Sequence, residues 1–197
     1  MGVAIVSLRV MLVDTSSARG AVLAQALADN GYEVVARVHD TKGILRMIED
    51  IQPDVVIIDM DSPDRDTLEN MSFVTRHQPR PIVLFTDDDD PVKIQTAVRA
   101  GVSAYVVAGV DTKRIKPIMD VAIARFREYQ ALREDLTKAQ NTLADRKLID
   151  RAKGILMQQR GVSEDDAYQL LRRAAMDNNE KVADIARKLV DVSKLLV

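Results

Sequence analysis

One stretch of about 35 residues, from Asp111 to Arg146, constrains the fold of this chain more than any other feature. Its apolar side chains recur every three or four positions, which draws a narrow seam along one side of a helix, as in a coiled coil. The stretch contains no glycine, and its one proline, Pro117, comes early enough for the first turn of a helix. The positions of the seam are Ile115, Ile118, Ala122, Phe126, Tyr129, Leu132, Leu136, Ala139 and Leu143.

A helix of this length is a rod of roughly 50 Å, at ~1.5 Å per residue. A lone rod would leave much of its apolar seam in water. We therefore expect the first three turns to pack on a domain of the same chain. We expect the later turns to pair with a second copy, which predicts a homodimer held by a coiled coil.

The composition is that of an ordinary globular protein and excludes several classes. The 197 residues are 47% hydrophobic and 29% charged, which allows one or two domains, each with its own core. Because there is no cysteine, disulfides, cysteine–metal sites and thiol nucleophiles are excluded. No run approaches the roughly 18 consecutive apolar residues of a membrane span, and the first residues lack the features of a signal peptide. We expect a cytoplasmic protein that makes no membrane contact.

The first half of the chain alternates apolar runs with amphipathic segments. Apolar residues at helical spacing predict helices over residues 17–30, 41–50 and 90–100. Strands that alternate with helices at this period predict an α/β fold with a doubly wound parallel sheet. The five predicted strands are Arg9–Asp14, Tyr32–Val38, Pro53–Asp59, Pro81–Thr86 and Ala104–Val107.

Three of these strands end in a polar residue: Asp14, Asp59 and Thr86. In a doubly wound sheet, chemistry collects beyond the carboxyl ends of the central strands, so these side chains are expected at one edge. Two carboxylates and a hydroxyl could hold Mg²⁺, which prefers oxygen ligands, or could present one aspartate as a phosphoryl acceptor. They could also be ordinary turn or capping residues. The acidic run Asp87–Asp90 is expected to be a solvated loop that caps the helix beginning at Pro91.

Several motifs between residues 8 and 126 together resemble a response-regulator receiver domain, which has a flavodoxin-like fold. They are Leu12-Val-Asp14, Pro53–Asp59, Pro63, Thr86, Ala100-Gly101 and Ala104–Val107. The resemblance implies that Asp59 accepts a phosphoryl group from the phosphohistidine of a sensor histidine kinase. It also implies that Asp14 and Asp59, with the backbone carbonyl of Asp61, hold Mg²⁺. Thr86 would hydrogen-bond the phosphoryl oxygen, and Tyr105 would be the aromatic residue that reorients on activation.

Two positions depart from the receiver pattern. The first strand of a receiver usually ends in two acidic residues, whereas Asp14 is followed by Thr15. The fifth usually ends in Lys-Pro, whereas Val107 is followed by Ala108-Gly109. A missing carboxylate weakens Mg²⁺ binding, and a missing lysine removes a cation that pairs with the phosphoryl group. Two modes of control therefore stay open: phosphorylation by the kinase, or docking of a ligand-sensing inhibitory partner without phosphorylation.

The tail of the chain is basic, whereas the rest is acidic. Residues 146–197 carry 11 basic and 8 acidic side chains, and residues 1–145 carry 17 and 22. The two parts are therefore expected to have different partners. Apolar spacing and a capping box at Ser163–Asp166 predict a small all-α bundle. So small a bundle needs support, which a dimeric coil would give. Its three helices are expected over residues 146–160, 165–176 and 182–190.

The tail resembles an ANTAR domain, an RNA-binding module, over residues 129–191. The motifs that carry this resemblance are Arg151–Met157, Gly161-Val-Ser-Glu164, Ala167-Tyr168, Leu171-Arg172, Ala175-Met176 and Val182–Ala186. Dimers of the family bind paired hairpins in a nascent leader mRNA, so that the overlapping terminator cannot form and the polymerase reads on. The resemblance therefore implies a transcription antiterminator.

RNA binding needs cations for phosphates and groups that stack on, or hydrogen-bond to, splayed loop bases. Tyr168 is the only aromatic residue of the tail and could stack on a base, or could be a half-buried helix residue. Gly154 could allow another helix or RNA to approach closely, because no side chain intervenes. The four cations that we expect to contact phosphates and base edges are Arg151, Lys153, Arg172 and Arg173.

These expectations divide the chain into a receiver at residues 1–126, a coiled-coil helix at 112–146 and an ANTAR domain at 129–191. The overall likeness is to regulators of nitrate and nitrite assimilation. Such a protein is not an enzyme, except that it can catalyse its own phosphoryl transfer. The alternative is a DNA-binding response regulator. It would need a recognition helix dense in base-reading side chains, and residues 165–176 offer only Gln169, Arg172 and Arg173.

Overall fold

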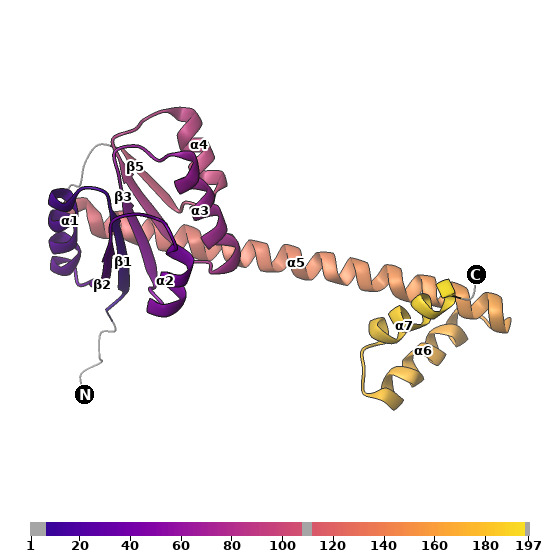
Figure 1. Cartoon of the computed structure of the whole chain (residues 1–197). Coiled ribbons are helices and arrows are strands. Elements are labelled where there is room, and N and C mark those ends of the chain that lie inside the picture. The colour runs from indigo at the N-terminus through magenta and orange to yellow at the C-terminus, as the bar shows by residue number, and fades with distance from the viewer. Residues whose placement is uncertain (1–6, 108–111, 196–197) are drawn as a thin grey trace, which may run out of the picture. The chain divides into compact units, whose positions relative to one another are not determined.

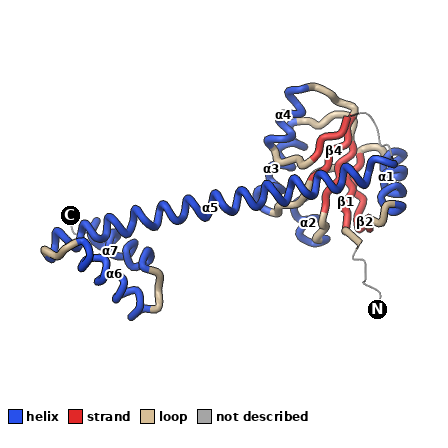
Figure 2. The backbone as a smooth tube through the Cα atoms, turned by 180° about the vertical axis from the view of Figure 1, so that it is seen from behind, coloured by secondary structure: helices blue, strands red, loops and turns tan. Residues whose placement is uncertain are grey.

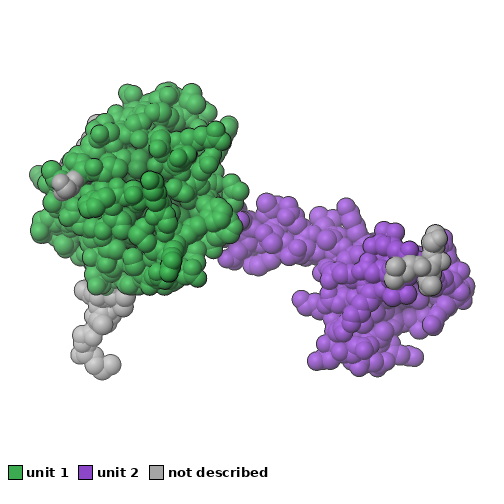
Figure 3. Space-filling model, viewed as in Figure 1, with its two compact units in different colours: residues 1–130 green, residues 131–197 purple. Residues whose placement is uncertain are grey.

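The computed structural model describes residues 7–107 and 112–195 (Figure 1). Two compact units make up the chain, residues 1–130 and residues 131–197, which Figure 3 shows in different colours. Each unit is described by itself. Among the described residues, no helix combines the length and the apolar character that crossing a membrane would require.

The first unit is built on a five-stranded sheet of order β2-β1-β3-β4-β5 (Figure 2). All neighbouring strands are parallel, so the chain crosses over through a helix between them. The predicted doubly wound α/β fold is confirmed. The strands are β1 (Arg9–Asp14), β2 (Glu33–Val38), β3 (Val55–Asp59), β4 (Ile82–Thr86) and β5 (Ala104–Val107). The helices of this unit are α1 (Ser17–Asp29), α2 (Ile44–Ile51), α3 (Arg65–His77), α4 (Pro91–Arg99) and the first turns of α5 (Ile115–Arg160).

Side chains of the central strands alternate between two cores, one on each face of the sheet. Met11 and Val13 of β1 lie in the core that α2, α3 and α4 cover. Val10 and Leu12 point the other way, into the core that α1 and the start of α5 cover. Because both faces are buried, the strands are continuous apolar runs, and their polar end residues lie at the edge of the sheet.

Helix α3 is an element that the sequence analysis does not predict. Its buried face combines Leu68, Met71 and Val74 with two threonines, Thr67 and Thr75, so polar residues interrupt the apolar stripe. A local signal was nevertheless present. The Asp64 carboxylate accepts a hydrogen bond from the Thr67 backbone N–H at 2.8 Å, as an N-cap residue does.

Helix α5 runs without a break for 46 residues. Ile115, Met119 and Ala122 are fully buried against the sheet, which confirms that its first turns pack on the domain. The first helix expected in the tail is the last part of this same helix. Gly154 does not interrupt it, and Gly161, with a φ of 64°, follows its last residue.

The second unit packs α6 (Glu164–Asn178) and α7 (Val182–Leu195) with the last turns of α5 around a small core. The Ser163 hydroxyl accepts a hydrogen bond from the Asp166 backbone N–H, which caps α6 as the capping box predicts. Asn179, with a φ of 55°, turns the chain between the two helices. The buried core residues are Ala152, Leu156, Ala167, Leu171, Ala186 and Val190.

Candidate functional site

The three polar strand ends meet at the carboxyl edge of the sheet. Asp14 is paired with Asp59 in the register of β1 and β3, and Thr86 ends the adjacent strand β4. All three side chains are buried, with 0%, 3% and 3% of their residue surface exposed. The structure therefore brings together the residues that the sequence placed at this edge.

Arg19 of α1 lies over the Asp59 carboxylate and contacts three aspartates at once. Its Nε lies 3.4 Å from Asp59 Oδ2, its Nη2 lies 2.7 Å from Asp61 Oδ1, and its Nη1 lies 2.9 Å from Asp87 Oδ2. Burial raises the pKa of Asp59, and the nearby carboxylates of Asp14, Asp87 and Asp61 add to that rise. Arg19 opposes it but does not cancel it.

Asp14 is held by a second arginine. Arg37 of β2 donates to Asp14 Oδ2 from Nη2 at 2.9 Å and from Nε at 3.2 Å. His39, which the sequence analysis gave no role, places Nδ1 3.5 Å from Asp14 Oδ1. A Cβ added to Gly20 would lie 2.2 Å from Asp14 Oδ2 and 2.8 Å from Arg37 Nη2. The ion pair therefore lies directly against the backbone of α1, and only glycine leaves room for it.

Thr86 and the Asp61 carbonyl are hydrogen-bonded to each other. The Thr86 hydroxyl donates to the Asp61 carbonyl oxygen at 2.8 Å, and the Asp87 backbone N–H donates to the same oxygen at 3.2 Å. The Thr86 hydroxyl in turn accepts from the Asp88 backbone N–H at 3.2 Å. Both lone pairs of the Asp61 carbonyl are thus used inside the protein, while the Asp61 carboxylate is largely exposed and bound to Arg19.

The loop after β4 links this edge to α4 and β5. Asp90 caps α4 by accepting from the Val92 backbone N–H at 2.8 Å, which confirms the predicted cap. Lys93 pairs with Asp88 at 2.6 Å, and hydrogen bonds from Lys93 and Ser62 lower the pKa of Asp88 to about 2. The Tyr105 hydroxyl donates to the Asp88 carbonyl at 2.8 Å, so this ring is tied to the loop.

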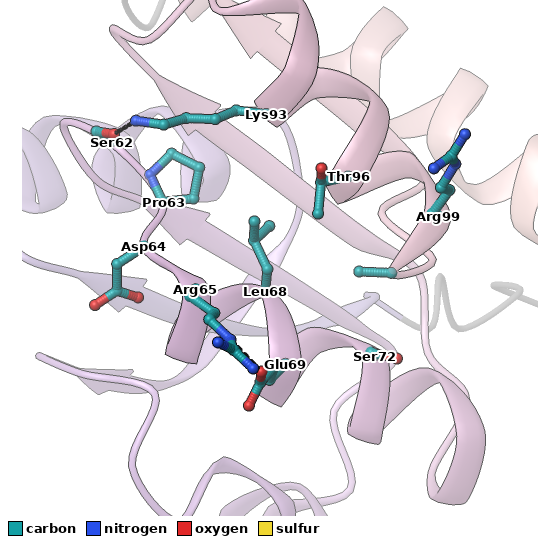
Figure 4. Close-up of a pocket in the computed structure, with 11 residues that line it drawn as sticks. Ser62, Pro63, Asp64, Arg65, Leu68, Glu69, Ser72, Lys93, Thr96 and Arg99 are labelled. Carbon is teal, nitrogen blue, oxygen red and sulfur yellow. Dashed lines mark hydrogen bonds and ion pairs between the residues drawn. The ribbon is translucent and has the colours of Figure 1, made fainter.

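An open pocket of about 700 Å³ adjoins this loop, between α3 and α4. Figure 4 shows Lys93 reaching to Ser62 at one end of it, with Leu68 on α3 and Thr96 on α4 along its length. Arg65 and Glu69 form an exposed ion pair at its rim.

On the tail, the residues expected to contact RNA differ in solvent exposure and in ion pairing. Arg151 on α5 and Arg172 and Arg173 on α6 are exposed. Tyr168 is 41% exposed and lies one turn before Arg172 on α6. Lys153 is different, because its side chain is only 16% exposed and its Nζ lies 2.7 Å from carboxylate oxygens of both Asp150 and Glu164.

Gly154 faces open space within its own chain. A Cβ added there would meet no atom of the described residues within 4 Å. The exposed residues Lys147, Arg151 and Gln158 lie on the same side of α5, at helical spacing from it. Nothing in the described fold of the tail therefore requires glycine at this position.

Two family profiles match this chain. The response regulator receiver domain matches residues 10–120, and the ANTAR domain matches residues 137–190. The chain is a response regulator of the receiver–ANTAR type. The resemblances drawn from the motifs are thereby confirmed. The receiver family implies a kinase partner and typically binds Mg²⁺, and the ANTAR family implies RNA binding.

Known proteins are similar to this regulator over different shares of its length. The transcriptional regulatory protein PdtaR of Mycobacterium tuberculosis is 31% identical over 183 residues, which are 93% of this chain and 89% of that protein. The nitrate regulatory protein of Klebsiella oxytoca is 38% identical over 80 residues, 41% of this chain and 20% of that protein. The signal receiver domain of a modulated diguanylate cyclase from Desulfovibrio desulfuricans shares the receiver fold, with a TM-score of 0.55 and 21% identity over 62% of this chain and 98% of that one.

The regulator's acidic edge does not fit Mg²⁺ as it is arranged. Asp14 is paired with Arg37, and Asp59 and Asp61 are paired with Arg19. Thr15, which replaces the second acidic residue of the family, is exposed. Across the described ranges, no group of three or more acidic, histidine or cysteine side chains is arranged to hold a metal ion. The other departure, Ala108-Gly109, lies outside the described residues.

Sequence reasoning missed Arg19, Arg37 and His39. Arg19 and Asp87 are 68 residues apart, and Arg37 and Asp14 are 23 apart, so no local pattern links them. A usable signal was present in the sequence for only one of them. Arg19 follows β1 by less than two helical turns, on the segment that leaves the edge where the strand ends point.

Proposed function

We propose that this regulator is a transcription antiterminator that binds paired hairpins in a nascent leader mRNA as a dimer. The observation that carries the proposal is the outer surface of the ANTAR unit. Its three helices bury one set of apolar side chains in a common core, and an aromatic residue and several arginines lie outside that core, beside exposed apolar side chains such as Met176. Exposed arginines can bind phosphates, and an exposed aromatic ring can stack on an unstacked base.

Tyr168 and Arg172 form the centre of the proposed RNA surface. They are four residues apart on α6, so their side chains are neighbours on the helix surface. Tyr168 would stack on a loop base while Arg172 contacts a phosphate or a base edge. Arg173 follows on α6, and Arg151 is exposed on α5, so both could add contacts to phosphates. A helix that presents so few base-reading groups supports RNA in preference to duplex DNA.

Lys153 has a different role in this proposal. It would reach RNA only by giving up both Asp150 and Glu164, each 2.7 Å away. Because Glu164 is the first residue of α6, the lysine ties the start of that helix to α5. Lys153 therefore orients α6, and the exposed arginines make the phosphate contacts.

The dimer is proposed to form along the exposed seam of α5. Tyr129, Leu132, Leu136 and Leu143 are 56–60% exposed within a single chain. Repeated large apolar side chains in water favour pairing with a second copy, whose seam is the same. A dimer would also place two ANTAR units on one RNA, which suits a target with two hairpins.

Control by the receiver is proposed to work through docking of a ligand-sensing partner protein. Asp59, the proposed phosphoacceptor, is 3% exposed and lies beneath Arg19. Thr86 is hydrogen-bonded to the Asp61 carbonyl and the Asp88 amide, and Tyr105 to the Asp88 carbonyl. A sensor histidine kinase that phosphorylates Asp59 with Mg²⁺ at Asp14, Asp59 and Asp61 is the alternative. It requires Arg19 to leave Asp59 and Asp61, and Arg37 to leave Asp14.

RNA binding can be tested without knowing the natural transcript. A pool of RNAs with two stem-loops and randomised loops would be selected on the full chain, and the enriched RNA titrated at several salt concentrations. Arg172→Ala should weaken binding and lower the slope of log affinity against log salt by about 1. Arg187→Ala is the matched control, because Arg187 is paired with Asp184 on α7 and with Asp145 on α5. Enrichment of no RNA, or equal affinity for a duplex DNA of the same sequence, would contradict the proposal.

A further inference from the structure

Arg19 is the centre of a cation–carboxylate cluster at the receiver's acidic edge. We propose that the Arg19 guanidinium supplies, from within the chain, the positive charge that a divalent cation supplies to a receiver's aspartates, so that Arg19 and Mg²⁺ compete for one site. The aspartates at the acidic edge of this regulator then have a positive charge beside them without a metal ion. The inference concerns the receiver alone and does not depend on RNA binding.

The first step is the geometry of the guanidinium. Its three nitrogens lie 2.7–3.4 Å from carboxylates of three aspartates on two segments: Asp59 and Asp61 at and just after the end of β3, and Asp87 just after β4. Among the described residues, Nη1 donates a hydrogen bond to Asp87, whereas Nε and Nη2 have no hydrogen-bond partner and act on Asp59 and Asp61 as a nearby positive charge. The guanidinium also stays charged at every accessible pH. A metal ion at this edge would have to contact some of the same oxygens.

The second step is the state of the buried carboxylates. Within the described part of the chain, Asp59 Oδ2 and Asp14 Oδ1 have no hydrogen-bond partner. Such oxygens need a nearby positive charge, because a buried unpaired carboxylate is costly. Arg19 provides that charge to Asp59, and Arg37 provides it to Asp14 at 2.9 Å. The two arginines together carry the same charge as one Mg²⁺ ion.

The third step concerns the other oxygen ligands that the receiver family offers to Mg²⁺, which here are hydrogen-bonded or replaced. Both lone pairs of the Asp61 carbonyl accept hydrogen bonds, from Thr86 and from Asp87. The chain has Thr15 where the receiver family has a second carboxylate. Loss of that carboxylate lowers the affinity for a metal ion, whereas the three contacts of Arg19 are retained. The substitution therefore favours Arg19 in the competition.

The competition gives Arg19 a positioning role as well. Its contact with Asp87 fixes the start of the loop whose next residue, Asp88, holds Lys93 and the Tyr105 hydroxyl. Removing the guanidinium should loosen this loop and expose the carboxylates to a metal ion. Because the Arg19 side chain is 33% exposed, its removal creates no large cavity.

The test compares the full-length wild type with Arg19→Ala, with and without millimolar Mg²⁺ at constant ionic strength. We expect the midpoint of thermal unfolding of the wild type to be the same in both buffers. The midpoint of Arg19→Ala should be lower without Mg²⁺ and should rise when Mg²⁺ is added, because a ligand of the folded state stabilises it. Calorimetric titration should show at least roughly tenfold tighter Mg²⁺ binding to the variant.

Arg65→Ala is the matched control, because Arg65 pairs only with the exposed Glu69 in the ion pairs of the described chain. It should respond to Mg²⁺ as the wild type does. Arg19→Gln keeps most of the side chain and serves if Arg19→Ala does not fold without metal. Equal Mg²⁺ affinity in wild type and variant would overturn the proposal, and so would a variant that is indifferent to Mg²⁺. RNA is absent from these measurements, so either result leaves the RNA proposal untouched.

Discussion

At the scale of single residues, the receiver's chemistry is decided by contacts between groups far apart in the chain. Asp59 and Asp14 are buried side by side at the ends of β3 and β1, and each faces one arginine. The apolar runs that end in aspartate made the positions of both carboxylates predictable. The arginines were not predictable, because α1 and β2 carry them and only the folded sheet brings them to this edge.

The pKa of Asp59 makes a prediction about pH. Burial raises this pKa above the value of an unfolded chain, so the folded state holds its proton to a higher pH. Ionisation of Asp59 therefore lowers stability as the pH rises from the unfolded pKa through the folded one. Asp59→Asn should raise the urea midpoint at neutral pH and flatten this part of the pH profile. Asp88→Asn is the control of opposite sign, since the pKa of Asp88 is lowered to about 2 and its contribution is lost as the pH falls towards that value.

Gly154 gives a second prediction at the residue scale. Glycine inside a helix is less stable than alanine by about 0.5–1 kcal/mol, and an added methyl group would meet nothing within the chain. Gly154→Ala should therefore stabilise the regulator by about that amount in urea denaturation. If RNA approaches the bare backbone here, the same variant should bind the selected hairpins more weakly. Unchanged RNA affinity would remove Gly154 from the RNA surface.

At the scale of elements, helices and strands were predicted where apolar residues recur at regular spacing, and one helix was missed where polar residues interrupt that spacing. The strands and the long helix are regular in spacing, and both were found. Helix α3 was missed because Thr67 and Thr75 share its buried face with Leu68 and Met71. The boundary expected near Arg146 is absent from the structure, because no glycine or proline lies near that residue, and α5 continues to Arg160.

The seam of α5 supplies the prediction for this scale. Leu136 is 59% exposed in a single chain, and replacement by glutamate would place two like charges in the proposed dimer contact. Leu136→Glu should shift the regulator from dimer to monomer in sedimentation velocity, with the helical circular dichroism retained. Asn141→Glu, an exposed position on the opposite side of the helix, should remain dimeric. A dimer that survives Leu136→Glu would show that the seam is not the interface.

At the scale of the whole molecule, a receiver whose acidic edge is paired with two of its own arginines is joined to an ANTAR unit with exposed arginines. Such a regulator would take its input from a docked protein and deliver its output to RNA. The family explains why these two units occur in one chain. The individual contacts of Arg19, Arg172 and Tyr168 explain how each unit would work in this one.

The most direct test of antitermination is transcription by purified polymerase through a selected pair of hairpins that overlaps a terminator. Wild-type protein should increase the fraction of full-length transcript, and Leu136→Glu and Arg172→Ala should each reduce that gain. A template in which the hairpin loops are scrambled but the terminator is kept should not respond. Unchanged termination with wild-type protein, under conditions where it binds the hairpins, would contradict the account and leave RNA binding without antitermination.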